Sequence, residues 1–327
     1  MSAFQAYRVF DDAGTVRGRV VDATLDELSA GDVVIKAAYS SVNYKDALAA
    51  TGGGKIIRTF PLIAGIDVSG TVESSSDTRF RAGDQVVVTG YDLGVAHDGG
   101  YSQYVRVPAD WVVPIPPGLG ALDAMAIGTA GFTAALSIVA LERNGLKPGQ
   151  GPVIVTGATG GVGSVAVQCL AALGYSVTAV TGKDSQHEYL RSLGASEVLS
   201  RSIAQPSARP LEKAMWTAAV DCVGGDMLAW LTRSMAYRGA IAASGLTGGI
   251  DLKLTVIPFI LRSVRLLGID SVMCPMDERL AAWARLATDM KPANLKTSVK
   301  EIGLPDLPEA FETLKNGAAR GRFVVRL

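Results

Sequence analysis

The sequence has few of the residues that form disulfides or hold metal ions. Its 327 residues include three cysteines and two histidines. Cys169, Cys222 and Cys274 lie far apart, and no CxxC pair occurs. This excludes a disulfide framework and argues against a zinc site of the usual ligand number. We expect three reduced, packed thiols in a cytoplasmic protein, with no bound metal.

The sequence also lacks an excess of charge of either sign. It has 31 basic and 31 acidic residues and a formal net charge of zero. Such a balance gives no overall attraction to nucleic acid or to a membrane surface. Met1–Phe10 lacks the apolar core of a secretory signal. Residues 148–182 contain no charged residue or histidine, but their glycines break any spanning helix, so we predict the buried centre of an α/β sheet.

The clearest motif lies within residues 153–175, VIVTGATGGVGSVAVQCLAALGY. Val153–Val155 has the β-branched composition of a buried parallel strand, and residues 162–173 are typical of a helix that ends at Gly174. The intervening glycines allow a sharp turn and close approach to a ligand. Because a helix N-terminus favours a pyrophosphate, we predict a dinucleotide site. Its expected backbone contacts are Thr159, Gly160, Gly161 and Val162.

The residues after the second strand, Ser176–Val180, indicate which cofactor binds. An NAD site normally has an acid there, whereas Thr181-Gly182-Lys183 offers the small polar residue and cation that suit a 2′-phosphate. Asp184 disagrees, but we assign it to the start of the next helix, ahead of a capping box at Ser185–Glu188. We therefore favour NADPH over NADH. Arg201 is either a second cation near the adenosine or a solvated loop arginine.

The chain length and the apolar content of 48% suit two hydrophobic cores. Residues 1–122 contain short strands and glycine-rich turns, which predict a mostly β domain. Strand candidates near 153, 176, 197, 218, 240 and 264 alternate with helical stretches, so residues 123–272 are expected to form a doubly wound parallel sheet. Residues 273–327 end in a strand, 322–327, that we expect to return to the first domain's sheet.

The order of a β domain, a GTAGFTA helix and a GATGGVG turn resembles the medium-chain dehydrogenase/reductase superfamily, in its zinc-free quinone-oxidoreductase branch. The resemblance implies a GroES-like catalytic domain beside a Rossmann domain, an α/β fold class. Zinc-dependent members carry a cysteine within the segment that is here residues 43–48, and Gly-His-Glu where this sequence has Gly65-Ile66-Asp67. Their four-cysteine structural lobe is also missing. The resemblance therefore implies chemistry without a metal.

Longer blocks narrow the resemblance. Residues 40–72, 127–142, 187–196, 256–275 and 321–327 closely resemble the NADPH-dependent acrylyl-CoA reductase subgroup. This implies reduction of the activated double bond of acrylyl-CoA to propanoyl-CoA, with NADPH as cofactor and a small acyl-CoA as substrate. It also implies a homodimer, with Val264–Ile269 extending the sheet across a two-fold axis.

Such a reaction needs donors for the charge that develops on the thioester oxygen, and a proton for the α-carbon. The resemblance places Asn43 and Tyr44 beside the nicotinamide. We assign Tyr44 to nicotinamide and substrate contact, although a tyrosine packed under the loop is the alternative. For Lys45 and Asp46, the alternative is an ion pair on the surface, which would make both residues uninformative about function.

Further cofactor contacts are expected along the chain. The family pattern places Thr129 near the nicotinamide ribose or phosphates, although a threonine in an apolar helix is more often structural. Leu246 and Ser271 directly follow the carboxyl ends of two strands, which is where ligands bind in open α/β sheets. Asn316 and Arg322 come from the returning tail, and Arg322 is either a phosphate clamp or a solvated arginine. The cationic loop 52–58 is a candidate for coenzyme A contact.

Three functions remain open from the sequence. The first is an enoyl-CoA reductase that uses NADPH. The second is a reductase of quinones or small α,β-unsaturated carbonyls on the same fold. The third is a structural or regulatory protein that binds the nucleotide without turnover.

Overall fold

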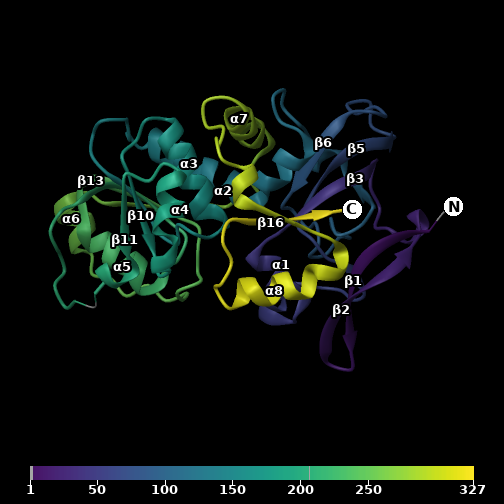
Figure 1. Cartoon of the computed structure of the whole chain (residues 1–327), viewed down its shortest axis with the longest axis horizontal. Coiled ribbons are helices and arrows are strands. Elements are labelled where there is room, and N and C mark those ends of the chain that lie inside the picture. The colour runs from purple at the N-terminus through teal and green to yellow at the C-terminus, as the bar shows by residue number, and fades with distance from the viewer. Residues whose placement is uncertain (1–2, 206) are drawn as a thin grey trace. The chain divides into compact units, whose positions relative to one another are not determined.

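The computed structural model describes residues 3–205 and 207–327 and divides into two compact units (Figure 1). The first unit comprises the residues up to Thr129 together with Val272–Trp283 and Leu295–Leu327, and the second comprises Ala130–Ser271 and Ala284–Asn294. The boundary thus lies at residue 130 rather than at the expected 123. The range 273–327 is also divided, because residues 284–294 pack on the second unit, where Asn294 N donates to Gln168 Oε1.

The first unit is built on two sheets. One has the strand order β2-β1-β4, and the other has the order β15-β16-β3-β5-β6-β8, with β7 paired to β3. The strands are β1 (Phe4–Asp12), β2 (Thr15–Ala23), β3 (Val33–Val42), β4 (Leu62–Ile63), β5 (Asp67–Ser75), β6 (Gln85–Thr89), β7 (Tyr104–Val107), β8 (Val113–Pro114), β15 (Val299–Ile302) and β16 (Arg322–Arg326). Alternating valines and isoleucines, such as Val33, Ile35 and Val68, fill the core of the larger sheet. The predicted mostly β first domain is confirmed.

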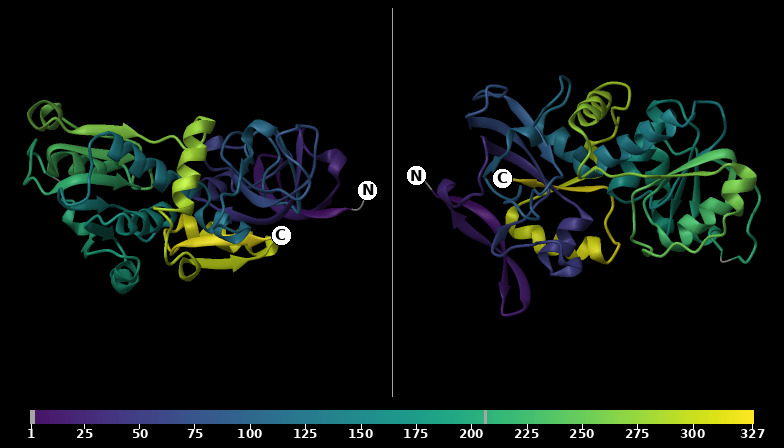
Figure 2. Two further views of the ribbon diagram at one scale, coloured as in Figure 1. Left: turned by 90° about the horizontal axis from the view of Figure 1, so that it is seen from above. Right: turned by 180° about the vertical axis from the view of Figure 1, so that it is seen from behind.

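The terminal strand does return to the first unit's sheet, as predicted. β16 pairs antiparallel with β3, so that Val324 lies opposite Ser41, and parallel with β15. Figure 2 shows β15 and β16 side by side, with the C-terminus at the end of β16. Helices α1 (Tyr44–Ala50) and α8 (Leu307–Lys315) pack together over a core that includes Ala47 and Phe311.

The second unit holds a six-stranded parallel sheet in the order β11-β10-β9-β12-β13-β14. Counted from β9, this is the Rossmann order 3-2-1-4-5-6. The elements are β9 (Val153–Val155), α3 (Gly161–Ala172), β10 (Val177–Thr181), α4 (His187–Ser192), β11 (Glu197–Ser200), β12 (Trp216–Asp221), α5 (Gly225–Ser234), β13 (Met235–Ala243), α6 (Ile257–Arg262) and β14 (Arg265–Gly268). The predicted doubly wound sheet is confirmed, and residues 148–182 form its centre.

Two helices, α2 (Ala121–Arg143) and α7 (Met276–Ala287), begin in the first unit and end in the second. Within the described residues, α2 is long and apolar enough to cross a membrane, but 83% of its most apolar stretch is buried in the protein. It is a core helix. It also bends at Gly128, where φ is 51° and ψ is −162°.

The capping box expected at Ser185–Glu188 is wrong. A 3₁₀ turn, Asp184–Gln186, follows β10, and α4 begins only at His187 with Gln186 as its N-cap. The Gln186 side chain makes no capping hydrogen bond. The physical reason is that the backbone closes the turn itself, through Gln186 N to Lys183 O and His187 N to Asp184 O.

Candidate active site

The glycine-rich turn of the second unit has the shape that a pyrophosphate needs. Gly157 has a φ of +58°, and Gly160 is the N-cap of α3. A Cβ on Gly163 would lie 2.5 Å from Gly157 O and 2.7 Å from the Ala158 Cα, so only glycine lets the helix approach the strand this closely. The first turn of α3 remains half-exposed at Gly161 and Val162. Its free N–H groups and dipole suit an anion.

The carboxyl end of β10 gathers two cations. Lys183 N donates to Thr181 Oγ1 over 3.1 Å, and Thr181 Oγ1 lies 3.5 Å from the Thr159 hydroxyl. A Cβ on Gly182 would lie 2.8 Å from Arg201 Nε, so the Arg201 side chain covers this glycine. Burial lowers the pKa of the half-buried Lys183. The arrangement suits a phosphate on the ribose, with Arg201 as the second cation.

Asp221, at the end of β12, was not singled out from the sequence. Its fully buried carboxylate accepts hydrogen bonds from Thr156 Oγ1 at 2.6 Å and from Gly224 N at 2.8 Å. Burial raises its pKa. It ties the turn after β9 to the neighbouring strand. The sequence feature that could have revealed Asp221 is an isolated acid directly after the uncharged segment Thr217–Val220.

Two further predicted cofactor residues lie after strands of this sheet. Leu246 follows β13 and is 53% exposed. Ser271 follows β14, and its hydroxyl accepts a hydrogen bond from Thr133 Oγ1 at 2.9 Å. Both occupy the strand-end positions that the sequence predicted.

In the first unit, Asp67 is the centre of a buried polar cluster. Its carboxylate accepts hydrogen bonds from Ser41 Oγ at 2.5 Å, Asn43 Nδ2 at 2.9 Å and Thr129 N at 2.9 Å. The Thr129 hydroxyl donates to its other oxygen. Asp67 has no exposed surface. Thr129 thus contacts a carboxylate of the protein itself.

Asp46 is the second buried carboxylate of this cluster. Its oxygens accept hydrogen bonds from Asn43 N at 2.8 Å, Asn43 Nδ2 at 3.2 Å and Ile66 N at 2.9 Å. Burial and the nearby charge of Asp67 raise its pKa to about 7. Asp46 is 1% exposed, so its interpretation as half of a surface pair with Lys45 is wrong. The signal was the Asn43-x-x-Asp46 spacing, which places an acid at the third position of α1.

Arg322, from β16, supplies the cation. Its Nη1 donates to Val42 O at 3.2 Å and to Asn43 Oδ1 at 3.0 Å, and its Nη2 donates to Ser41 Oγ at 2.7 Å and lies 3.8 Å from Asp67 Oδ2. The residue is 4% exposed, so the solvated-arginine alternative is wrong. Burial lowers its pKa, while the charges of Asp67 and Asp46 raise it. Tyr101 adds a hydroxyl that donates to Ser41 O at 3.3 Å.

The structure brings Asn43, Thr129 and Arg322 together in one buried cluster. The other residues predicted in the first unit lie outside it. Tyr44 is the first residue of α1, directly beside Asn43, and is half-exposed. Asn316 is the exposed C-cap of α8. Arg58, in the proposed coenzyme A loop, pairs with Asp92 at 3.4 Å.

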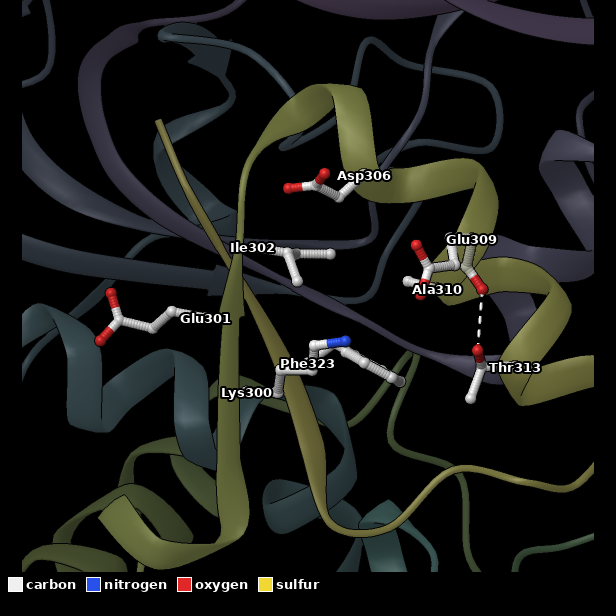
Figure 3. A pocket seen from close by; sticks show the side chains of 8 residues that line it. All are labelled: Lys300, Glu301, Ile302, Asp306, Glu309, Ala310, Thr313 and Phe323. Atoms are coloured by element: carbon white, nitrogen blue, oxygen red, sulfur yellow. Dashed lines mark hydrogen bonds between the residues drawn. The ribbon is translucent and has the colours of Figure 1, made fainter.

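A separate cavity of about 190 Å³ lies between β15, β16 and α8 (Figure 3). Three acids, Glu301, Asp306 and Glu309, line it with one lysine, Lys300. Asp306 accepts a hydrogen bond from Gly303 N at 2.8 Å and so caps a local turn. The excess of negative charge makes this cavity unsuitable for the phosphates of a nucleotide or of coenzyme A.

Comparison with known proteins assigns the family. Residues 29–117 match the alcohol dehydrogenase GroES-like domain, and residues 161–288 match the zinc-binding dehydrogenase domain. The chain is 50% identical to acrylyl-CoA reductase AcuI of Ruegeria pomeroyi over 316 residues, 96% of each chain. The chain belongs to the medium-chain dehydrogenase/reductase superfamily. It is equally similar, 50% over 326 residues and 99% of each chain, to the putative quinone oxidoreductase YhfP of Bacillus subtilis.

Solved structures agree with this fold. The Escherichia coli K-12 protein YhdH, determined with bound NADPH, is 49% identical and superposes with a TM-score of 0.96 over 98% of this chain and 99% of its own. The B. subtilis protein YhfP, determined with NAD bound, is 50% identical with a TM-score of 0.97 over 100% of both chains. The GroES-like domain and the Rossmann sheet of this chain are therefore those of the family.

The zinc in the name of the second domain family does not fit the residues of this chain. Among residues 3–205 and 207–327, no group of three or more histidine, cysteine or acidic side chains is placed to hold a metal. The two clustered carboxylates, Asp46 and Asp67, accept hydrogen bonds from protein donors, and the Arg322 guanidinium lies beside Asp67. A divalent cation there would be repelled by the arginine and would lack the nitrogen and sulfur ligands that zinc prefers.

Proposed function

We propose that this protein reduces the activated double bond of acrylyl-CoA to give propanoyl-CoA, with NADPH as reductant. The observation that carries the proposal is the 50% identity to acrylyl-CoA reductase AcuI over 96% of both chains. The protein is therefore an oxidoreductase of the CH–CH type, with a small acyl-CoA as its substrate. The aligned stretch, 96% of each chain, spans both the Asn43–Asp67 segment and the nucleotide turn.

The choice of NADPH is supported by the cations after β10. Relatives have been solved with NADPH and with NAD, so the family alone does not decide between them. In this chain Arg201 covers Gly182, and Lys183 follows directly, so two positive charges lie at the end of β10, where a 2′-phosphate is expected. The cofactor contacts that we propose are Tyr44, Thr129, Thr159, Gly160, Gly161, Val162, Thr181, Gly182, Lys183, Arg201, Leu246, Ser271 and Asn316.

When bound, the cofactor supplies the hydride that adds to the β-carbon of the thioester. The protein has to bind the thioester oxygen, on which negative charge develops, and to deliver a proton to the α-carbon. Tyr44, half-exposed at the start of α1, is the group that we assign to nicotinamide and substrate contact. Asn43 shares the site, but its amide hydrogens point to Asp46 and Asp67. It acts by holding the adjoining backbone.

A second candidate is a reductase of quinones or small α,β-unsaturated carbonyls. The name of the B. subtilis relative, which matches 99% of this chain at 50% identity, favours keeping it. Both reactions use the same hydride and fold, and only the first requires recognition of the coenzyme A thioester. The specificity constant for acrylyl-CoA relative to that for a free enone separates them.

The decisive experiment is an NADPH-oxidation assay with acrylyl-CoA, crotonyl-CoA, a free enone and a quinone, each repeated with NADH. We expect acrylyl-CoA with NADPH to give the highest kcat/KM and propanoyl-CoA as product. A higher kcat/KM for the quinone would favour the second candidate. NADPH binding without consumption with any acceptor would leave a nucleotide-binding protein without turnover.

We further propose a cytoplasmic homodimer. β14 is the outer strand of the six-stranded sheet. Exposed apolar side chains lie on β14 (Leu266), on the neighbouring β13 (Tyr237) and at α6, which precedes β14 in the chain (Val256, Ile260 and Leu261). A second copy that pairs along β14 would cover them and continue the sheet. Sedimentation equilibrium tests this, and Ile260→Asp is expected to shift the protein towards monomer. The three free cysteines suit a reducing compartment.

A further inference from the structure

The Asn43 carboxamide is held in one orientation by charged neighbours on both sides. Its Oδ1 accepts from Arg322 Nη1 at 3.0 Å, while its Nδ2 donates to Asp67 Oδ2 at 2.9 Å and to Asp46 Oδ2 at 3.2 Å. A guanidinium only donates and an ionised carboxylate only accepts, so the reversed amide would meet like groups on each side. Both amide hydrogens are therefore used inside the protein, and neither is left for a substrate.

This arrangement fixes the start of α1. Asp46 also accepts from the backbone N of Asn43 at 2.8 Å and from Ile66 N at 2.9 Å, so α1 is tied to the residue before β5. Tyr44 is the next residue after Asn43 and the first of the helix. We infer that Arg322, Asp67 and Asp46 are positioning residues that act through Asn43 to set the place of Tyr44. The inference rests on the proposed function, in which Tyr44 contacts the reacting groups.

The charges of the cluster explain why an arginine is needed. Four titratable groups face one another: Asp46 on α1, Asp67 on β5, Tyr101 ahead of β7, and Arg322 on β16. Two carboxylates and one guanidinium are all at most 4% exposed. Without the guanidinium, two buried carboxylates would share Asn43 with no positive charge to offset them, so the pKa of Asp46, already about 7, would rise further. A protonated carboxyl accepts less well from Asn43, which loosens the start of α1.

β16 provides a matched pair of arginines for the test. Arg322 points into the cluster, whereas Arg326, four positions further along the same strand, has a side chain 66% exposed and pairs with Glu301 at 2.6 Å. We would compare Arg322→Met, Arg322→Lys and Arg326→Met. For each variant, kcat and KM for acrylyl-CoA are measured with NADPH between pH 6 and 9, together with NADPH affinity and hydrogen exchange of the α1 amides.

We expect Arg322→Met to lower kcat by about tenfold or more and to move the pH profile to higher pH by on the order of one unit, because an opposite charge this close shifts a carboxyl by about that much. NADPH affinity should change little, exchange in α1 should accelerate, and Arg322→Lys should restore part of kcat. Arg326→Met should resemble the wild type. A loss of NADPH affinity alone would overturn the inference and return Arg322 to the role of phosphate clamp, and so would an unchanged pH profile with unchanged exchange.

A second variant covers the case in which Arg322→Met does not fold. Asp67→Asn keeps the shape but turns one acceptor oxygen into a donor that faces Asn43 or Thr129. We expect it to lower kcat and accelerate exchange in α1, and wild-type values of both would overturn the inference. The exchange measurement needs no turnover. An inactive wild-type protein would therefore refute the proposed function, whereas unchanged α1 exchange in the variants would refute the positioning role.

Discussion

Replacing Gly128 by alanine is the sharpest test of whether the buried cluster is rigid. Gly128 lies at the bend of α2 with a φ of 51° and a ψ of −162°. This region of backbone space is essentially restricted to glycine, and a side chain there costs roughly 1–3 kcal/mol of strain. An added Cβ would also lie 2.6 Å from Arg322 Nη2, 2.7 Å from Asp67 Oδ2 and 2.7 Å from Ser41 Oγ.

None of those three atoms can withdraw without loss. Arg322 Nη2 donates to Ser41 Oγ at 2.7 Å, and Ser41 Oγ donates to Asp67 at 2.5 Å. Breaking one hydrogen bond to a charged group costs about 1.5–3 kcal/mol. Added to the backbone strain, this gives a loss of about 2.5–6 kcal/mol in the free energy of unfolding for Gly128→Ala.

Gly83→Ala is the matched control. Gly83 has a φ of +96°, but a Cβ there would meet no atom within 4 Å, so only the backbone cost of about 1–2 kcal/mol remains. Urea unfolding followed by circular dichroism measures both variants, and kcat is measured beside it. We expect Gly128→Ala to lose at least twice as much stability as Gly83→Ala and most of its activity. Equal losses in the two variants, with full activity in both, would refute a rigid cluster.

Four other predictions follow. Arg201→Met should weaken NADPH binding by about 10- to 100-fold and leave NADH binding unchanged in calorimetry, because one charge-assisted hydrogen bond is worth about 1.5–3 kcal/mol; equal losses for both cofactors would contradict it. The raised pKa of Asp46, about 7, means that the folded protein holds a proton that the unfolded chain releases near pH 4. Its contribution to stability, up to about 4 kcal/mol, is complete below pH 4 and lost as the pH rises to 7, so the difference in thermal midpoint between wild type and Asp46→Asn should change across that window and not above it. Tyr44→Phe should lower kcat by about 10- to 100-fold if the hydroxyl takes part in proton transfer, and unchanged turnover would remove it from the mechanism. Dialysis against a chelator should leave kcat unchanged, and activity that zinc restores would show that our assessment of the metal ligands is mistaken.

Features encoded by neighbouring residues could be predicted from the sequence. β9 begins and ends at the predicted residues, Val153 and Val155, and α3 lies within one residue of its predicted bounds. Both follow from the local sequence, since a β-branched run and a glycine turn restrict the backbone whatever surrounds them. The capping box at Ser185–Glu188 shows the limit of this reasoning, because a backbone turn satisfied the same groups first.

The charged cluster could not be predicted, because its members are far apart in the chain. Arg322 and Arg326 lie in the same short strand and look alike in sequence, yet one is buried and the other exposed. Residues four positions apart in a strand lie on the same face, so the difference comes from what covers each end of β16, and the groups that bind Arg322 lie at the distant residues Ser41–Asn43. Asp46 was misread for the same reason, since its donor Ile66 N lies 20 residues away.

The large sequence separation within this cluster has a consequence for the order of folding during translation. Asn43 and Arg322 are 279 residues apart, and the whole nucleotide-binding unit is translated between them. Until β16 has been synthesised, Asp46 and Asp67 have no guanidinium to offset them, whereas the strands of the Rossmann sheet, nearly continuous in the chain, are already available to pair. The nucleotide-binding fold can therefore form during translation before the buried cluster of the first unit is complete.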